Sequence, residues 1–136
     1  MIIFEIPGEA VGKERPRTTK RGFTYTPAKT RDYEEFVKFK FREKYKGQPT
    51  TEAVWVSIIV WIVPAKSWSK KKKKEMIEKP PIRTPDADNI AKIILDALND
   101  AAWKDDKQVV HLEVEKLWGF EEKVVVTIAT KEDFEK

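Results

Sequence analysis

The sequence contains no cysteine and a single histidine, His111. These absences exclude disulfide bonds, thiolate zinc sites and metal sites built from several imidazoles. Any metal ion must therefore be held by oxygen atoms, which are the ligands of hard ions such as Mg²⁺ and Mn²⁺. His111 falls on the polar face of a predicted strand, and we interpret it as a surface residue rather than a ligand.

The sequence also lacks a long hydrophobic run. No segment approaches the about 20 apolar residues that a membrane-spanning helix requires. The N-terminus has no basic segment leading into a hydrophobic signal core. We therefore expect a cytoplasmic protein without membrane contact. Its 136 residues suffice for one domain with a hydrophobic core, and we treat residues 1–136 as a single domain.

The net charge of +4 conceals an uneven distribution. Residues 1–84 contain 20 Lys and Arg against 10 Asp and Glu, whereas residues 85–136 contain 7 against 13. An enzyme that acts on a polyphosphate backbone needs cations to bind it and carboxylates to bind a metal ion. A chance feature of surface composition is the alternative interpretation.

Hydrophobic periodicity predicts five strands and three helices. The predicted strands cover residues 2–6, 23–26, 53–63, 107–118 and 123–130, and the predicted helices cover residues 27–46, 69–78 and 90–102. We expect the strand at 23–26 to close a hairpin with the residues before it. The last strand should return antiparallel to the strand at 107–118. In the first helix, Phe39 and Phe41 are expected in the core, and residues 131–136 form a charged tail.

The segment 53–63 is apolar on both faces of the predicted strand, with Trp55 and Trp61 on the same side. One face can pack on the core of the domain. The other face needs a covering helix or a second subunit. This is the main feature of the pattern that indicates a dimer.

Two segments concentrate positive charge. A loop with five cations in nine residues contains Lys13, Arg15, Arg17, Lys20 and Arg21. A run of five lysines follows the third predicted strand: Lys70, Lys71, Lys72, Lys73 and Lys74. Both segments suit contacts to phosphate groups. Both can equally be solvated surface segments, and the residues alone leave the two interpretations open.

Carboxylates stand on both sides of the amphipathic helix at 90–102. Asp86 and Asp88 precede it, and the pair Asp105 and Asp106 follows it and leads into a strand. If the helix packs on that strand, we expect the two acidic clusters to meet at one edge and hold one hard divalent ion. The alternative is that Asp86 or Asp88 only caps the helix.

Two lysines lie where they can assist such a site. Lys92 is one turn after Asp88 and can stabilise charge on an attacked phosphate, or it can simply pair with Asp88 or Asp96. Lys116 shares the register of the apolar residues in the strand at 107–118. It must either extend past the strand end or reach a carboxylate cluster.

Taken together, these segments resemble the RusA family of Holliday-junction resolvases over most of the chain. The resemblance rests on GKERPR at 12–17, YTP at 25–27, PDADNIAK at 85–92, DALN at 96–99 and WKDDKQV at 103–109. Lys116 follows ten residues beyond Asp106. The family often has a basic residue before the first aspartate, where this chain has Pro85, and Arg83 is the candidate substitute for that DNA contact.

The resemblance implies a homodimeric α+β fold, with a small mixed or antiparallel sheet and flanking helices. It implies that Asp86, Asp88 and Asp106 bind Mg²⁺, with Mn²⁺ as a possible substitute, and that Lys92 is catalytic. Four further positions match the family in supporting roles: Asn89, Asp96, Asp105 and Lys116. We therefore predict a Mg²⁺-dependent endonuclease that resolves four-way DNA junctions by paired symmetric nicks. The alternatives are a branched-DNA-binding protein without catalysis and a nuclease for other branched or flapped DNA.

Overall fold

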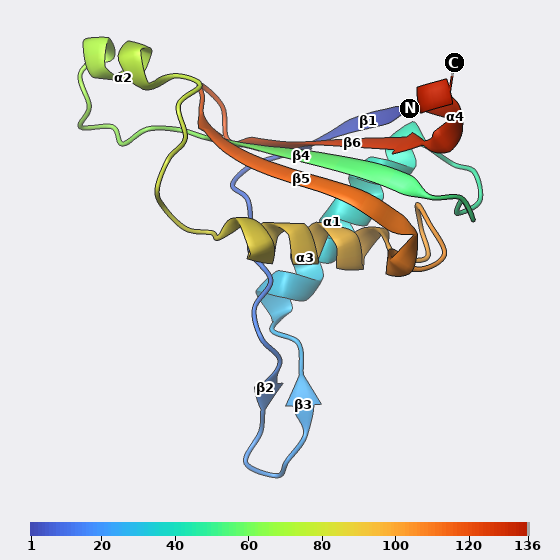
Figure 1. Ribbon diagram of the computed structural model, residues 1–136. Helices are drawn as coiled ribbons and strands as arrows, with labels where there is room; N and C mark the ends of the chain where they lie inside the picture. Colours follow the sequence, from blue (N-terminus) through green and yellow to red (C-terminus); the bar gives the residue numbers. More distant parts are fainter. Residues whose placement is uncertain (136) are drawn as a thin grey trace.

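The computed structural model describes residues 1–135 and contains a four-stranded mixed sheet (Figure 1). In spatial order the strands are β1 (Ile2–Pro7), β6 (Lys123–Thr130), β4 (Val54–Ile62) and β5 (Val109–Trp118). The pairs β1–β6 and β6–β4 are antiparallel, whereas β4 and β5 are parallel. The predicted strand at 123–130 is confirmed. Its predicted pairing with β5 is wrong, because β6 lies between β1 and β4 instead.

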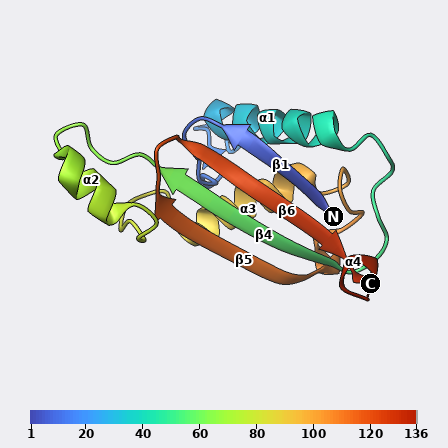
Figure 2. The same cartoon turned by 90° about the horizontal axis from the view of Figure 1, so that it is seen from above.

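Two long helices, α1 (Ala28–Lys44) and α3 (Ala87–Leu98), lie on the same side of the sheet (Figures 1 and 2). Helix α2 (Lys70–Met76) and a small hairpin of β2 (Arg17–Thr18) and β3 (Thr24–Tyr25) project from this body in different directions. The expected hairpin is thus confirmed. Helix α4 (Lys131–Glu135) replaces the expected charged tail over residues 131–135, and residue 136 lies outside the described part. None of the helices within residues 1–135 is long and apolar enough to cross a membrane.

Helix α3 belongs to the crossover that joins the parallel strands β4 and β5. Parallel neighbours cannot be joined by a tight hairpin, and a helix commonly spans the return. In Figure 1, α3 runs beneath β5 in the opposite direction to the strand. Its start therefore lies near the end of β5, and its end lies near the start of β5. This direction decides where the acidic residues on either side of the helix are found.

The core lies between the sheet and the two long helices. Alternate residues of β4, from Val54 to Ile62, are at most 4% exposed, as expected for the face that packs on α3. Phe41 is fully buried, but the prediction for Phe39 is wrong: it is 62% exposed, because the core-facing stripe of α1 passes through Tyr33 and Val37 instead.

The opposite face of β4 presents the side chains between these buried positions, including Trp55 and Trp61, which are only partly buried. Figure 2 looks onto this side of the sheet, and no helix of residues 1–135 lies across it. Of the two covers expected for this face, a helix is therefore not present within residues 1–135, and the expectation of a second subunit stays a prediction.

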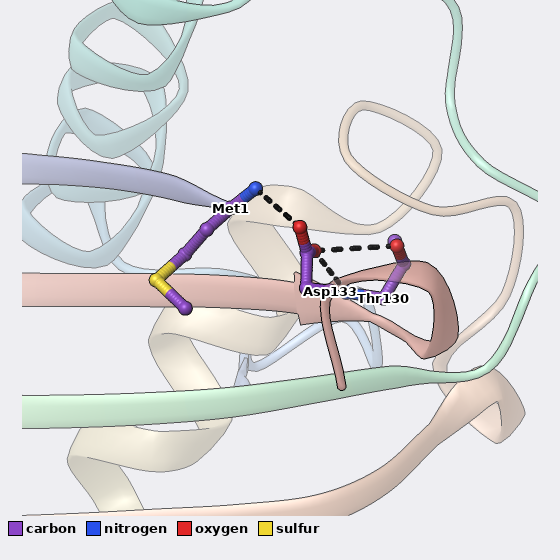
Figure 3. A network of polar contacts seen from close by, with 3 residues as sticks. All are labelled: Met1, Thr130 and Asp133. Carbon is purple, nitrogen blue, oxygen red and sulfur yellow. Dashed lines mark hydrogen bonds and ion pairs between the residues drawn. The ribbon is translucent and has the colours of Figure 1, made fainter. Parts of the chain in front are cut away.

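The amino end of the chain is tied to α4 by one carboxylate (Figure 3). Asp133 accepts hydrogen bonds from the Met1 ammonium at 2.9 Å and from the backbone N–H of Thr130 at 2.8 Å. These bonds to the charged form lower the pKa of Asp133 from 3.8 to about 2. They link β1, the edge strand, to the element that follows β6.

Candidate functional site

Two of the predicted ligands lie at the exposed start of α3. Asp86 occupies the N-cap position and Asp88 lies in the first turn, and both side chains are exposed. Asp86 makes no side-chain capping bond, although a carboxylate in this position commonly does so. Within residues 1–135 neither carboxylate forms a hydrogen bond or an ion pair. Both are free for a ligand from outside the chain, and the positive end of the helix dipole favours their negative charge there.

The turn before α3 packs against the base of the hairpin arm, which we define as residues 13–27. A Cβ atom added at Gly12 would lie 3.0 Å from Cβ of Pro85 and 3.2 Å from Cβ of Asn89, so glycine permits this close approach. The backbone N–H of Lys13 donates to the carbonyl of Asn89 at 2.9 Å. Asn89 thus supports the site through its backbone. The arm begins directly beside the turn that presents Asp86.

Lys13 is the one arm cation that is used inside the protein. Its ammonium pairs with Glu34 of α1 and, at 3.1 Å, with Asp96 of α3, and its side chain is only 15% exposed. Burial lowers the pKa of Lys13, but hydrogen bonds and charge from the two carboxylates outweigh this and raise the pKa above 10.5. Lys13 and Asp96 thus join α1, α3 and the arm through ion pairs inside the protein.

Lys92 lies one turn after Asp88 and is exposed. In the structure Lys92 forms no ion pair with Asp88 or Asp96, so the alternative interpretation of this lysine is wrong. In the described part of the chain its ammonium has no ion-pair partner, and Asp96 is engaged by Lys13 instead. The ammonium of Lys92 therefore remains available to an anion that approaches the start of α3.

The third predicted ligand is fixed by a buried tryptophan. The indole Nε1 of Trp103, which is 0% exposed, donates to Oδ1 of Asp106 at 2.8 Å. Asp106 begins the short 3₁₀ helix η1 (Asp106–Gln108), which Asp105 and Gln108 close with a reciprocal capping box. The side chain of Gln108 also donates to the carbonyls of Thr50 and Glu52. One oxygen of Asp106 is thus bound, and the other has no protein partner within residues 1–135.

Sequence reasoning had left Trp103 and Gln108 without a role. The WKDDKQV segment contained a signal that could have assigned one. An aspartate three residues after a tryptophan, on a tight turn, lies within reach of the indole N–H, which needs a partner when it is buried.

The expected meeting of the two acidic clusters within one chain is wrong. Asp86 and Asp88 lie at the start of α3, whereas Asp106 follows its end, and the helix of 12 residues is about 18 Å long. Carboxylates that share a Mg²⁺ ion each lie about 2.1 Å from it. Accordingly, residues 1–135 contain no group of three carboxylate or imidazole side chains that could hold a metal ion. The three ligands of a single chain do not fit one ion.

The other predicted DNA contacts lie on protruding or exposed segments. In the arm these are Arg15, Arg17, Lys20 and Arg21, all exposed; Arg17 lies 3.4 Å from Glu14 across the surface. In α2, Ser69 is the N-cap, since its hydroxyl accepts from the N–H of Lys72. The Lys72 ammonium lies 4.2 Å from the centre of the Trp68 ring. Arg83 is exposed beside the turn that carries Asp86.

Two remaining residues lie on β5. His111 is an exposed residue that contacts Glu113 at 3.0 Å, which agrees with its interpretation as a surface histidine. Lys116 does not extend past the strand, and among residues 1–135 it meets no carboxylate. Its ammonium donates instead to the backbone carbonyls of Arg83 and Pro85.

Comparisons with known proteins agree with the resemblance found in the sequence. The family model described as Endodeoxyribonuclease RusA matches residues 7–129. The chain is 37% identical over 134 residues to the uncharacterized protein YqaN of Bacillus subtilis strain 168, and the match covers 93% of this chain and 94% of that protein.

Proposed function

The chain belongs to the RusA endodeoxyribonuclease family, and on this basis we propose that it is a homodimeric, Mg²⁺-dependent endonuclease that resolves four-way DNA junctions by paired nicks. The family itself implies a nuclease that acts on branched DNA. The metal ion, the dimer and the site residues are our proposal for this protein. The observation that supports them best is that Asp86, Asp88 and Lys92 at the start of α3 are exposed and without protein partners among residues 1–135, beside a basic arm.

We infer that the metal site forms between two copies of the chain. Asp86 and Asp88 of one copy and Asp106 of the other would hold the ion, since one chain keeps these groups about one helix length apart. A two-fold symmetric dimer contains two such sites, which matches the two strands that a resolvase must cut. Mn²⁺ has a similar preference for oxygen ligands and is expected to substitute for Mg²⁺.

The exposed edge of β5 is the proposed contact between the copies. This strand has ten residues and lies at the end of the sheet, and Val110 and Leu112 are 59% and 41% exposed. Proteins seldom leave so long an edge strand with exposed apolar side chains unpaired. A second β5 added by two-fold symmetry runs antiparallel to the first. It would bring the Asp86 turn of one copy toward the Asp106 end of the other.

The roles of the site residues follow from their chemistry. A divalent ion held by the carboxylates would polarise the phosphodiester and generate a nucleophilic water near neutral pH. Lys92, exposed and unpaired within residues 1–135, would stabilise the negative charge that develops on the phosphate. Trp103 would keep Asp106 oriented through its indole N–H. Asp105 would support the turn of Asp106 from within the capping box and would not itself be a ligand.

DNA binding is proposed for two separate basic segments. The arm, with Arg15, Arg17, Lys20 and Arg21, begins beside the start of α3. Helix α2 carries Lys70–Lys74 on a second projection (Figure 1). Cations on two projections suit a substrate with several duplex arms, because each can contact a different backbone. Arg83 would contact the phosphates nearest the site.

The test is cleavage of a synthetic four-way junction with and without Mg²⁺, read at nucleotide resolution. Asp88→Asn should abolish cleavage and leave junction binding within about twofold, because it removes a metal ligand and no DNA-binding cation. Asp100→Asn is the matched control, with the same change in charge at an exposed aspartate. Its positive φ of 62° is a conformation that asparagine accepts readily.

Each alternative predicts a different outcome of the same experiment. A protein that binds the junction tightly but cuts no DNA with Mg²⁺ or Mn²⁺ would be a branched-DNA-binding protein without catalysis. Cleavage of flaps and three-way junctions at rates equal to the four-way junction would indicate a broader structure-selective nuclease. An Asp88→Asn variant with full activity would contradict the assignment of the site.

A further inference from the structure

Lys116 occupies an unusual position for a strand lysine. It lies in the register of β5 that faces α3, together with Leu112 and Val114. Lysines in such a register usually extend their ammonium to water at the strand end. Here the ammonium donates to the backbone carbonyl of Arg83, and to that of Pro85 at 3.2 Å.

We propose that Lys116 is a positioning residue, which holds the turn of residues 83–86 so that Asp86 and Asp88 keep the arrangement needed to bind the metal ion. This inference rests on the proposed function for its consequence in catalysis. Its structural part, the fixing of the turn by the ammonium, stands on the contacts alone.

The turn has little else to hold its backbone. Among the described residues, no backbone–backbone hydrogen bond involves residues 80–85, and Pro85 has no N–H to donate. The first backbone bond after this stretch is from Ile90 to the carbonyl of Asp86. The Lys116 ammonium therefore supplies the polar contacts on both sides of the Thr84–Pro85 bond. Hydrogen bonds from a charged donor are stronger than those between neutral groups.

Two separate segments of the chain contact the turn of residues 83–86. On one side, Gly12 lies against Pro85 and Asn89, with no space for a larger residue. From β5, Lys116 binds the carbonyls of Arg83 and Pro85, which precede Asp86. Since Asp86 uses no side-chain cap to fix itself, its placement depends on this backbone. A carboxylate that needs no capping bond can offer all its oxygen lone pairs to a metal ion.

The test compares Lys116→Met, Lys116→Arg and the control Lys46→Met. Methionine keeps most of the length of lysine and removes its donors, whereas arginine keeps a charged donor that can reach two carbonyls. Lys46 is an exposed lysine after α1, and its replacement removes the same charge away from the turn. Junction cleavage is measured as a function of Mg²⁺ concentration. Hydrogen exchange of the Ile90 and Lys13 amides is measured without metal or DNA, and the melting temperature is recorded.

We expect Lys116→Met to raise the Mg²⁺ concentration for half-maximal cleavage by at least about tenfold, the usual effect of losing a group that orients metal ligands. Its junction affinity should stay within about twofold of wild type. The Ile90 and Lys13 amides should exchange faster, and Lys116→Arg should recover most of both effects. Lys46→Met should match wild type in each measurement.

An unchanged Mg²⁺ dependence together with unchanged exchange at Ile90 and Lys13 would overturn the proposal. So would a loss of cleavage in Lys116→Met that only follows its melting temperature, since that indicates a general structural role. If the wild type cuts no branched DNA, the proposed function fails instead. The exchange data then still decide whether Lys116 holds the turn.

Discussion

Mixing two inactive variants provides the sharpest test of a metal site shared between two copies. Asp88→Asn removes a proposed ligand at the start of α3, and Asp106→Asn removes the proposed ligand beyond its end. Each pure variant should be inactive, because both of its sites lack one carboxylate. In a mixed dimer, the two mutations fall in the same site, and the other site contains all three native aspartates.

The size of the recovery follows from the symmetry. Equal amounts of two variants that exchange subunits freely give about half mixed dimers, and each mixed dimer has one intact site of two. The mixture should therefore show about one quarter of the wild-type sites. A site within one chain would give no recovery, because each chain of the mixture carries one mutation. The helix length of about 18 Å between the two positions makes the shared site the expected result.

The assay uses a supercoiled plasmid that extrudes a cruciform, incubated with Mg²⁺. Wild type should produce linear plasmid, because its two sites cut both strands. The mixture should produce nicked circles instead, because a mixed dimer has one functional site. A mixture as inactive as its parents, under conditions where subunit exchange is demonstrated, would refute the shared site. Recovery of linear plasmid would also contradict this reasoning.

Three further predictions concern separate parts of the structure. Trp103→Phe keeps an aromatic ring but removes the part of the buried indole that carries the N–H bound to Asp106. It should cost about 2–4 kcal/mol in the free energy of unfolding, from the lost hydrogen bond and the cavity. It should also reduce the cleavage rate at limiting Mg²⁺ by at least about tenfold, measured by thermal melting and Mg²⁺ titration. Arg17→Gln combined with Arg21→Gln should make the plot of log junction affinity against log salt less steep, by about 0.9 for each DNA phosphate that the variant no longer neutralises. Lys13→Met should mainly lower the melting temperature, because the Lys13 ammonium is bound inside the protein. Asp133→Asn should lower the melting temperature at neutral pH. Because the pKa of Asp133 in the folded protein, about 2, lies below its ordinary value of 3.8, the difference in melting temperature from wild type should shrink as the pH falls from about 4 to 2. A difference that stays constant over this range would contradict the lowered pKa of Asp133.

Much of the secondary structure could be predicted from local patterns. The strand at 54–62 follows from its β-branched and aromatic composition, and the apolar stripe of α3 follows from residues spaced three and four apart. The serine before the lysine run is also a local signal, since Ser69 caps α2. The predicted start of α3 was late by three residues, because Asp86 takes the cap position in place of the residues nearest the apolar stripe.

The order of the strands could not be predicted in this way. Gly119 and the short spacing between β5 and β6 favoured a hairpin, but β6 pairs with β1 and β4. The residues of a turn do not indicate which distant strand will pair with the strand that follows the turn. This error had a direct consequence for the site. The crossover between the parallel strands β4 and β5 contains α3, which runs antiparallel to both strands, and that direction separates the residues before α3 from those after it.

The separation of the aspartates also has a physical advantage for the folded chain. Carboxylates placed together without a cation repel one another and penalise the charged form. Here Asp88 is favoured by the positive end of α3, and Asp106 by the indole of Trp103. In the proposed site, each half can therefore fold before any ion is bound. On this reasoning the ion contributes little to the folding of one chain and acts where the two halves meet, in contrast to structural metal sites whose ligands come together only with the metal. Removing Mg²⁺ should accordingly abolish cleavage while leaving the melting temperature of the protein almost unchanged.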